Sequence, residues 1–127
     1  MWHTLSLVRA TPPKRLIWMG DSLTRLPAFP RPVQDEVGYA LYLAQVGGKH
    51  VNAKLLRGMG SGVLEVVSDH RGDTFRAVYV VRFADCVYVL HSFQKKSRAG
   101  IATPRPDVAL IKERLARAVA LENAQED

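Results

Sequence analysis

The chain has 127 residues, 47% of them hydrophobic and 24% charged, and carries 18 basic against 12 acidic side chains, a formal net charge of +6. These values are close to globular averages and suit one small domain that buries its own core. A single cysteine, Cys86, excludes an internal disulfide framework, and no Cys/His spacing of a metal site occurs. We therefore expect no metal and no other cofactor.

The same sequence favours a location inside the cell. No run approaches the roughly 18 apolar residues of a membrane span, and the first residues lack the features of a signal peptide. We expect a cytoplasmic protein without a membrane partner. The excess of positive charge indicates a polyanion, usually nucleic acid, or an acidic protein as partner.

The first third of the chain predicts one strand and two helices. Residues 1–14 end in "TPPK", which cannot continue a helix or a central strand, and are expected to form an N-terminal extension. "RLIWM" (15–19) predicts a strand, and "GDS" after it signals a turn and a helix start. A short helix is expected in "DSLTRLPAFP", limited by Pro27 and Pro30. A second helix, from Pro32 to Gly47, follows from apolar residues at helical spacing, namely Val33, Val37, Ala40, Leu41 and Ala44.

The rest of the chain predicts three strands and a final helix. Residues 62–68, 74–83 and 86–94 read as strands joined by tight connections, hence an antiparallel meander. A polar loop follows (95–106), then an amphipathic helix marked by Val108, Ile111, Leu115 and Val119. The order strand, helix, helix, three-strand meander, helix predicts an α+β domain over residues 15–121. We expect a small, mainly antiparallel sheet with the helices packed on one face, and a polar C-terminal tail at 122–127.

Alternation along the strands sorts the polar side chains into faces. Arg76 shares a face with Val78 and Val80, and His91 shares one with Val89 and Phe93. How these faces meet depends on the strand register, which the sequence does not give. A buried structural histidine is commoner than a catalytic one, and paired lysines at a strand end are ordinarily solvated. The glycine-rich "GMGSG" matches no phosphate-binding loop, because it precedes a strand.

Residues 64–115 nevertheless carry a recognisable pattern. "LEVV", "TFRAVY", "VLHSFQKKS" and Thr103-Pro104, followed by a basic amphipathic helix, resemble the HigB/RelE-type toxins of type II toxin–antitoxin systems. The likeness is to the phage-derived HigB-like branch of the RelE/ParE superfamily, and it covers roughly residues 14–121. It implies a RelE-like fold. It also implies a ribosome-dependent, metal-independent endoribonuclease, an mRNA interferase that inhibits translation through attack of the RNA 2′-hydroxyl on the adjacent phosphate.

The resemblance assigns roles residue by residue. The catalytic set would be Arg76 as a phosphate clamp, His91 as acid or base, and Lys95 and Lys96 as phosphate contacts. The residues expected to bind RNA or the ribosome are Lys54, Arg57, Phe93, Gln94 and Arg98. Glu65 is expected to be structural, for example by pairing with Arg76. No tyrosine follows Tyr88, which weakens a tyrosine-dependent mechanism and places more weight on the histidine and the lysines.

The resemblance also implies partners: a helix-turn-helix, HigA-like antitoxin, the ribosome and mRNA, with operator DNA bound only through the antitoxin complex. The alternative is a RelE/ParE-fold protein without nuclease activity, either an inhibitor of DNA gyrase or an inactive partner-binding module.

Overall fold

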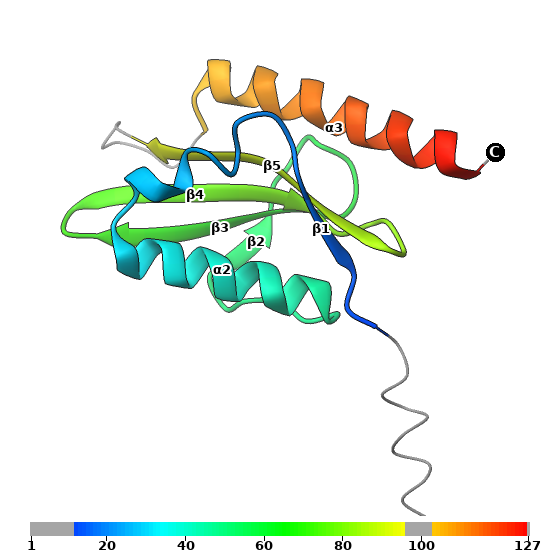
Figure 1. The fold of residues 1–127 in the computed structure, drawn as a ribbon. Helices are drawn as coiled ribbons and strands as arrows, with labels where there is room; N and C mark the ends of the chain where they lie inside the picture. Colours follow the sequence, from blue (N-terminus) through cyan, green and yellow to red (C-terminus); the bar gives the residue numbers. More distant parts are fainter. Residues whose placement is uncertain (1–11, 96–102, 127) are drawn as a thin grey trace, which may run out of the picture.

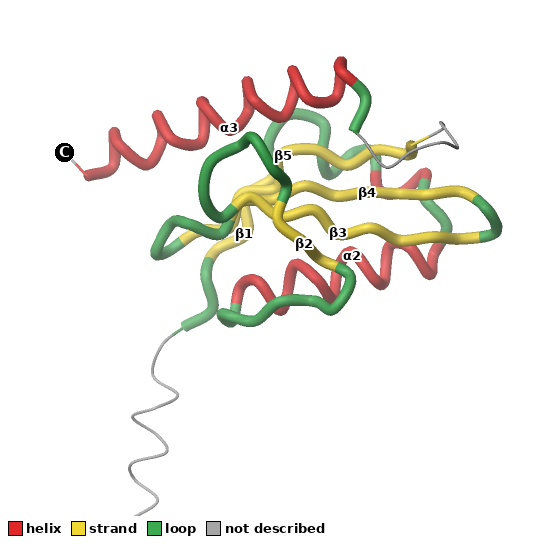
Figure 2. Tube along the Cα trace, turned by 180° about the vertical axis from the view of Figure 1, so that it is seen from behind, coloured by secondary structure: helices red, strands yellow, loops and turns green. Residues whose placement is uncertain are grey.

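Five strands form one sheet in this protein, for which a computed structural model describes residues 12–95 and 103–126. In chain order the elements are β1 (Arg15–Trp18), the 3-10 helix η1 (Leu26–Ala28), α2 (Arg31–Gln45), β2 (Ala53–Leu55), β3 (Val63–His70), β4 (Asp73–Val80), β5 (Cys86–Lys95) and α3 (Arg105–Glu126). The strand order is β1-β5-β4-β3-β2, with β1 parallel to β5 and the other pairs antiparallel (Figures 1 and 2). The predicted α+β class and the mainly antiparallel sheet are confirmed.

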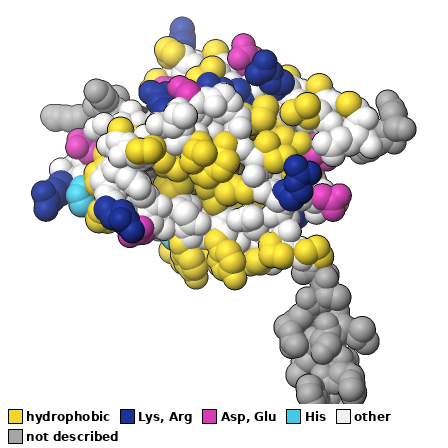
Figure 3. Space-filling view, viewed as in Figure 1, with side chains coloured by type: hydrophobic (Ala, Val, Ile, Leu, Met, Phe, Trp, Pro, Cys, Tyr) yellow, Lys and Arg dark blue, Asp and Glu magenta, His cyan; other side chains and the backbone are white. Residues whose placement is uncertain are grey.

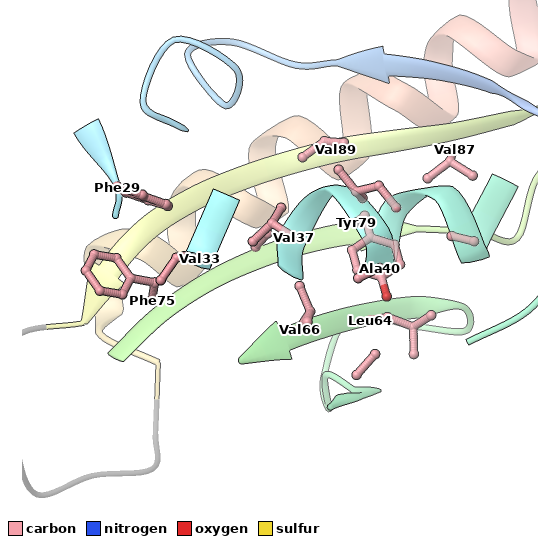
Figure 4. Close-up of a cluster of buried hydrophobic side chains, with 14 residues drawn as sticks. Phe29, Val33, Val37, Ala40, Leu64, Val66, Phe75, Tyr79, Val87 and Val89 are labelled. Carbon is pink, nitrogen blue, oxygen red and sulfur yellow. The ribbon is translucent and has the colours of Figure 1, made fainter. Parts of the chain in front are cut away.

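The two helices cover opposite faces of this sheet (Figure 1), so the expectation that the helices share one face is wrong. The α2 face buries Phe75, Ala77 and Tyr79 of β4 together with Val87 and Val89 of β5 (Figure 4). The α3 face buries other side chains of the same two strands, namely Val78, Val80, Cys86, Tyr88 and Leu90. Strands that are apolar on both faces need a cover on each side.

Local sequence explains the helices. Pro32 stands in the first turn of α2, where its missing N–H costs no hydrogen bond, and the five apolar residues predicted at helical spacing are all buried. The short helix expected between residues 21 and 30 is reduced to the three residues of η1, because Pro27 and Pro30 prevent a longer ladder. α3 continues to Glu126, so most of the predicted polar tail is helical. The division of the chain at residues 14 and 121 stays a prediction.

A bulge in β5 changes the face of one functional candidate. His91 lies opposite Val78 and Val89 lies opposite Tyr79, so that Leu90 is an extra residue in the ladder. Leu90 therefore packs on the α3 side, and the bulge turns His91 to that side as well, where it contacts Asp107 of α3. The predicted sharing of a face by His91 and Val89 is wrong for this reason.

A polar anchor ties the middle of α3 to the other end of the chain. Arg114 is buried, and its guanidinium donates to the carbonyl oxygen of Leu90 at 2.9 Å and to Oδ1 of Asp21 at 2.8 Å. The bond from Arg114 holds the pKa of the Asp21 carboxyl below its usual value of 3.8. Gly20 is needed beside this anchor: its φ is +53°, and a Cβ there would lie 2.5 Å from the guanidinium.

Apolar side chains also reach the surface of α2. Figure 3 shows them as a row along the lower edge of the molecule, and the exposed large ones on α2 are Tyr39 and Tyr42. This row lies on the side of the sheet away from α3.

No helix in the described ranges is both long and apolar enough to cross a membrane.

Two buried tyrosines give a stability prediction, because their hydroxyls differ in hydrogen bonding. Tyr88 donates to Oε2 of Glu122 at 2.6 Å, whereas the buried hydroxyl of Tyr79 has no hydrogen-bond partner among the described residues. Burial raises the pKa of Tyr79 to about 12. An unsatisfied buried hydroxyl costs about 1 kcal/mol or more, and a bond to a carboxylate contributes about 1.5 kcal/mol or more.

Tyr79→Phe should therefore raise the free energy of unfolding by about 1 kcal/mol, and Tyr88→Phe should lower it by a similar amount. Urea denaturation of the two variants measures the pair, each serving as the control of the other. Equal destabilisation by both substitutions would contradict the assignment of an unsatisfied hydroxyl to Tyr79.

Candidate nucleic-acid interface

A buried ion pair lies at the centre of the sheet on the α3 side. Arg76 of β4 donates from Nη1 to Oε2 of Glu65 on β3 at 2.9 Å, and the two residues are only 4% and 1% exposed. Thr103 places its hydroxyl 3.4 Å from the same carboxylate oxygen. The pairing suggested for Glu65 is thus present, and it fixes the direction of the guanidinium.

Two lysines stand on either side of this ion pair. Lys95, at the end of β5, is 5% exposed, and both its burial and the charge of Arg76 lower its pKa. Lys54 lies opposite Glu65 in the β2–β3 register and is exposed. Positive groups from three strands therefore surround one carboxylate, an arrangement that leaves a net positive charge for an anionic ligand.

Two hollows open on either side of Lys54, and we call them the groove and the edge hollow. The groove has a volume of about 820 Å³ and is bounded by the segment 54–59 and by α3; it is lined by Lys54, Arg57, Glu65, Thr103, Val108 and Lys112, among others. The edge hollow has a volume of about 630 Å³, lies beside β3, and includes Lys54, Arg76 and Thr74 together with the acidic Glu36 and Asp69. The groove has three cations against one paired acid, so it is the more basic of the two.

Both carboxylates of the edge hollow accept hydrogen bonds from neighbouring side chains. Glu36 accepts hydrogen bonds from Ser68 at 2.5 Å and from Asn52 at 2.6 Å, and Asp69 accepts one from Thr74 at 2.9 Å. Arg76 thus lines the edge hollow among bonded acids, with only 4% of its surface exposed.

His91 occupies a different position from the cations. Its ring is 0% exposed, stacks on Phe93 with centroids 4.8 Å apart at 16°, and holds Nε2 at 2.7 Å from Oδ1 of Asp107. Burial lowers the pKa of His91, and the hydrogen bond to Asp107 partly opposes this shift. His91 lines neither the groove nor the edge hollow.

The other residues predicted from the sequence to bind RNA or the ribosome lie in different places. Arg57 lines the groove. Phe93 is buried beneath α3, so its ring is packed in the core in this structure. Gln94 lies on the opposite side, in a shallow hollow beside Arg25 and Phe29, away from the ion pair. Lys96 and Arg98 lie outside the described residues.

The sequence did not identify three residues of this region: Thr103, Asp107 and Lys112. The signal at Thr103 is a hydroxyl just before a helix, besides its place in the motif. Asp107 carries the signal of an acidic residue in the first turn of a helix. Lys112 follows the buried Ile111 on α3, and only the packing of that helix shows that it faces the groove.

The described residues offer no metal centre. Within 12–95 and 103–126, no three His, Cys, Asp or Glu side chains gather closely enough to hold an ion.

Residues 24–116 match the family described as "Phage derived protein Gp49-like (DUF891)". The chain belongs to this family. No curated protein matches the sequence. Among solved structures, a double arginine mutant of the E. coli toxin RelE in the free state superposes with a TM-score of 0.53 over 84% of this chain and 98% of that chain, at 14% identity. This Gp49-like protein therefore shares the fold of RelE, as the resemblance implied.

The buried histidine predicts a pH dependence of stability. Because the pKa of His91 in the folded state lies below its usual 6.5, the unfolded chain binds a proton more readily than the folded one. Above about pH 6.5, His91 is neutral in both states and the free energy of unfolding does not depend on its protonation. As the pH falls from there toward the pKa of His91 in the folded state, protonation of the unfolded chain lowers the free energy of unfolding. Asp21 makes the free energy of unfolding depend on pH only in a lower range, around and below its usual pKa of 3.8.

His91→Gln, which does not titrate, should flatten the loss of unfolding free energy between about pH 7 and about pH 5. Urea denaturation across that range measures it, with the parent chain in the same buffers as the reference. An unchanged slope in His91→Gln would show that the ring is not held neutral by burial.

Proposed function

We propose that this Gp49-like protein is the toxin of a type II toxin–antitoxin pair, of the HigB-like kind, and that it cleaves mRNA on the ribosome. The observation that carries the proposal is the buried Arg76, which Glu65 holds beside Lys95 and which lines the edge hollow. The groove adjoins this hollow at Lys54 and is also lined by Arg57 and Lys112. Three further facts support it: the family match, the fold shared with a protein described as a toxin, and the net charge of +6.

The reaction needs charge stabilisation more than it needs a strong base. The 2′-oxygen of one nucleotide attacks the adjacent phosphorus, the P–O5′ bond breaks, and a 2′,3′-cyclic phosphate and a 5′-hydroxyl result. The 2′-hydroxyl loses a proton and the leaving oxygen gains one. The pentacoordinate phosphorus carries extra negative charge, which preorganised cations stabilise without reorganisation at the moment of reaction.

Arg76 and Lys95 are assigned to that phosphate. The guanidinium of Arg76 is oriented by Glu65, and its planar fork can hold two phosphate oxygens. Lys95, whose pKa burial lowers, gives up a proton more readily than an exposed lysine and suits protonation of the leaving O5′. Lys54, Arg57 and Lys112 contact neighbouring phosphates along the groove. Lys96 and Arg98 are proposed as additional phosphate or ribosome contacts.

The partners follow from this assignment. The ribosome would present one codon of mRNA to the groove, and such positioning supplies much of the rate when only weak acids and bases are available. A helix-turn-helix, HigA-like antitoxin would neutralise the protein by covering the basic surface, and operator DNA would be bound through that antitoxin. The place of action would be the cytoplasm.

Addition of the purified protein to a cell-free translation system should generate new mRNA 5′ ends, and only while ribosomes translate. Arg76→Lys retains the charge beside Glu65 but loses the fork, and should lower the cleavage rate about tenfold to a hundredfold. Lys54→Ala changes an exposed side chain and should weaken cleavage without changing stability. Arg31→Ala, on α2 at the opposite face, removes the same unit of charge and should match the parent.

Intact mRNA with normal translation would contradict the proposal. DNA breaks with intact mRNA would indicate a gyrase inhibitor instead. If neither the parent nor Arg76→Lys cleaves mRNA or inhibits translation, and the protein still binds an antitoxin, the protein is an inactive partner-binding module.

A further inference from the structure

His91 is poorly placed to move a proton to or from RNA. A general acid or base must reach the reacting atoms directly or through one water. Nε2 of His91 is taken by Asp107 at 2.7 Å, and Nδ1 is buried without a hydrogen-bond partner among the described residues. One face of the ring is stacked on Phe93. The imidazole ring is therefore held in a fixed position by its hydrogen bond and its stacking.

The residue to which His91 is bonded lies next to the wall of the groove. Asp107 lies in the first turn of α3. Val108, the next residue, and Lys112, one turn further, line the groove. A bond at Asp107 therefore ties the first turn of α3, whose next residue lines the groove, to β5.

The same anchor acts on the ion pair at the floor. Thr103 precedes α3 by two residues, and its hydroxyl contacts the Glu65 carboxylate that Arg76 binds. The backbone N–H of Val108 donates to the carbonyl of Pro104 at 3.0 Å, which joins this segment to the first turn of the helix. His91 is thus bonded to Asp107, the backbone of residues 103–108 joins Asp107 to Thr103, and Thr103 contacts the Glu65 carboxylate that Arg76 binds.

We propose that His91 is a positioning residue, which holds the first turn of α3 through Asp107 and thereby fixes the groove wall and the Glu65–Arg76 pair. Asp107 and Thr103 become members of the site by this inference. Its kinetic consequence rests on the proposed function, whereas its structural consequence does not.

Glutamine distinguishes positioning from proton transfer, because its Nε2 can occupy the place of the histidine Nε2 and donate to Asp107 but cannot carry a proton near neutral pH. His91→Gln and Asp107→Asn should keep cleavage within about threefold of the parent, with the same pH profile, since the bond between them is retained. Asp107→Ala removes the bond from a side chain that is 24% exposed, so this variant tests the contact without opening a buried cavity. It should lower kcat/KM about tenfold, with a rise in KM from the loosened groove wall.

The double variant His91→Gln/Asp107→Ala should lose no more kcat/KM than Asp107→Ala alone, because the same bond is already removed.

Leu115→Ala is the matched control, because it destabilises α3 further along the helix, where Leu115 packs against the apolar core. Rates are compared per folded molecule, so a loss of stability alone leaves kcat/KM of this control at the parental value. An equal loss in Leu115→Ala and Asp107→Ala would reduce the effect to general stability and overturn the inference. A loss of a hundredfold or more in His91→Gln, with a changed pH profile, would restore His91 as the proton carrier.

Amide hydrogen exchange separates this inference from the proposed function. Amides of residues 108–112 should exchange faster in Asp107→Ala than in the parent, and at the parental rate in His91→Gln. This result is expected whether or not the protein cleaves mRNA, so a parent without nuclease activity would overturn the proposed function alone. Unchanged exchange in Asp107→Ala would overturn the anchoring role itself.

Discussion

The buried pair of Glu65 and Arg76 is the interaction on which the functional face depends. Two opposite charges on adjacent central strands lie 2.9 Å apart with almost no exposure. Removal of one partner from such a pair leaves an uncompensated buried charge and costs about 3–5 kcal/mol. A pair of this kind is weak support for stability, since apolar residues of similar size often do as well. Its better explanation here is orientation: the carboxylate aims the guanidinium, and the same carboxylate receives Thr103 from the segment that leads into α3.

The second constraint is the need to cover a sheet that is apolar on both faces. α2 covers one face and α3 covers the other (Figure 2). Because α3 lies on the face that carries the ion pair, a structural helix also becomes a wall of the groove. Core packing and the candidate site therefore share one element. The anchors of α3, Arg114 in its middle and Asp107 at its start, are polar contacts of a mainly apolar interface.

Much of the fold could be predicted from local pattern, and the misses have physical causes. The spacing of the apolar residues in α2 is a strong signal, because this helix buries one side consistently. β3 and β4 are predicted as strands from short, largely apolar runs, and both bury side chains on both faces of the sheet. β2 has three residues, of which only Ala53 is buried, too short for any alternation to show. The bulge at Leu90 shifts the alternation by one residue, and nothing in the letters of β5 marks it. The prediction that His91 shares a face with Val89 is therefore wrong, whereas His91 and Phe93 do lie on the same side of the sheet.

The site shows the same division between local and long-range information. Arg76 and Lys95 were found through a motif, and their burial around Glu65 depends on strand register. Lys112, Thr103 and Asp107 enter the site only through the packing of α3 across the sheet, a contact between segments far apart in the chain. Such contacts are set by tertiary structure and leave little local trace.

The central claim is that Arg76 contacts the phosphate at which mRNA is cut. A cryo-electron microscopy map of the protein on a programmed ribosome tests it most directly, with mRNA made uncleavable by a 2′-O-methyl group in the presented codon. The account predicts the RNA backbone in the groove beside Lys54, with the guanidinium of Arg76 within hydrogen-bond distance of the phosphate that follows the methylated nucleotide. RNA bound elsewhere on the protein, with Arg76 still enclosed by Glu65 and Thr103 and far from any phosphate, would contradict it.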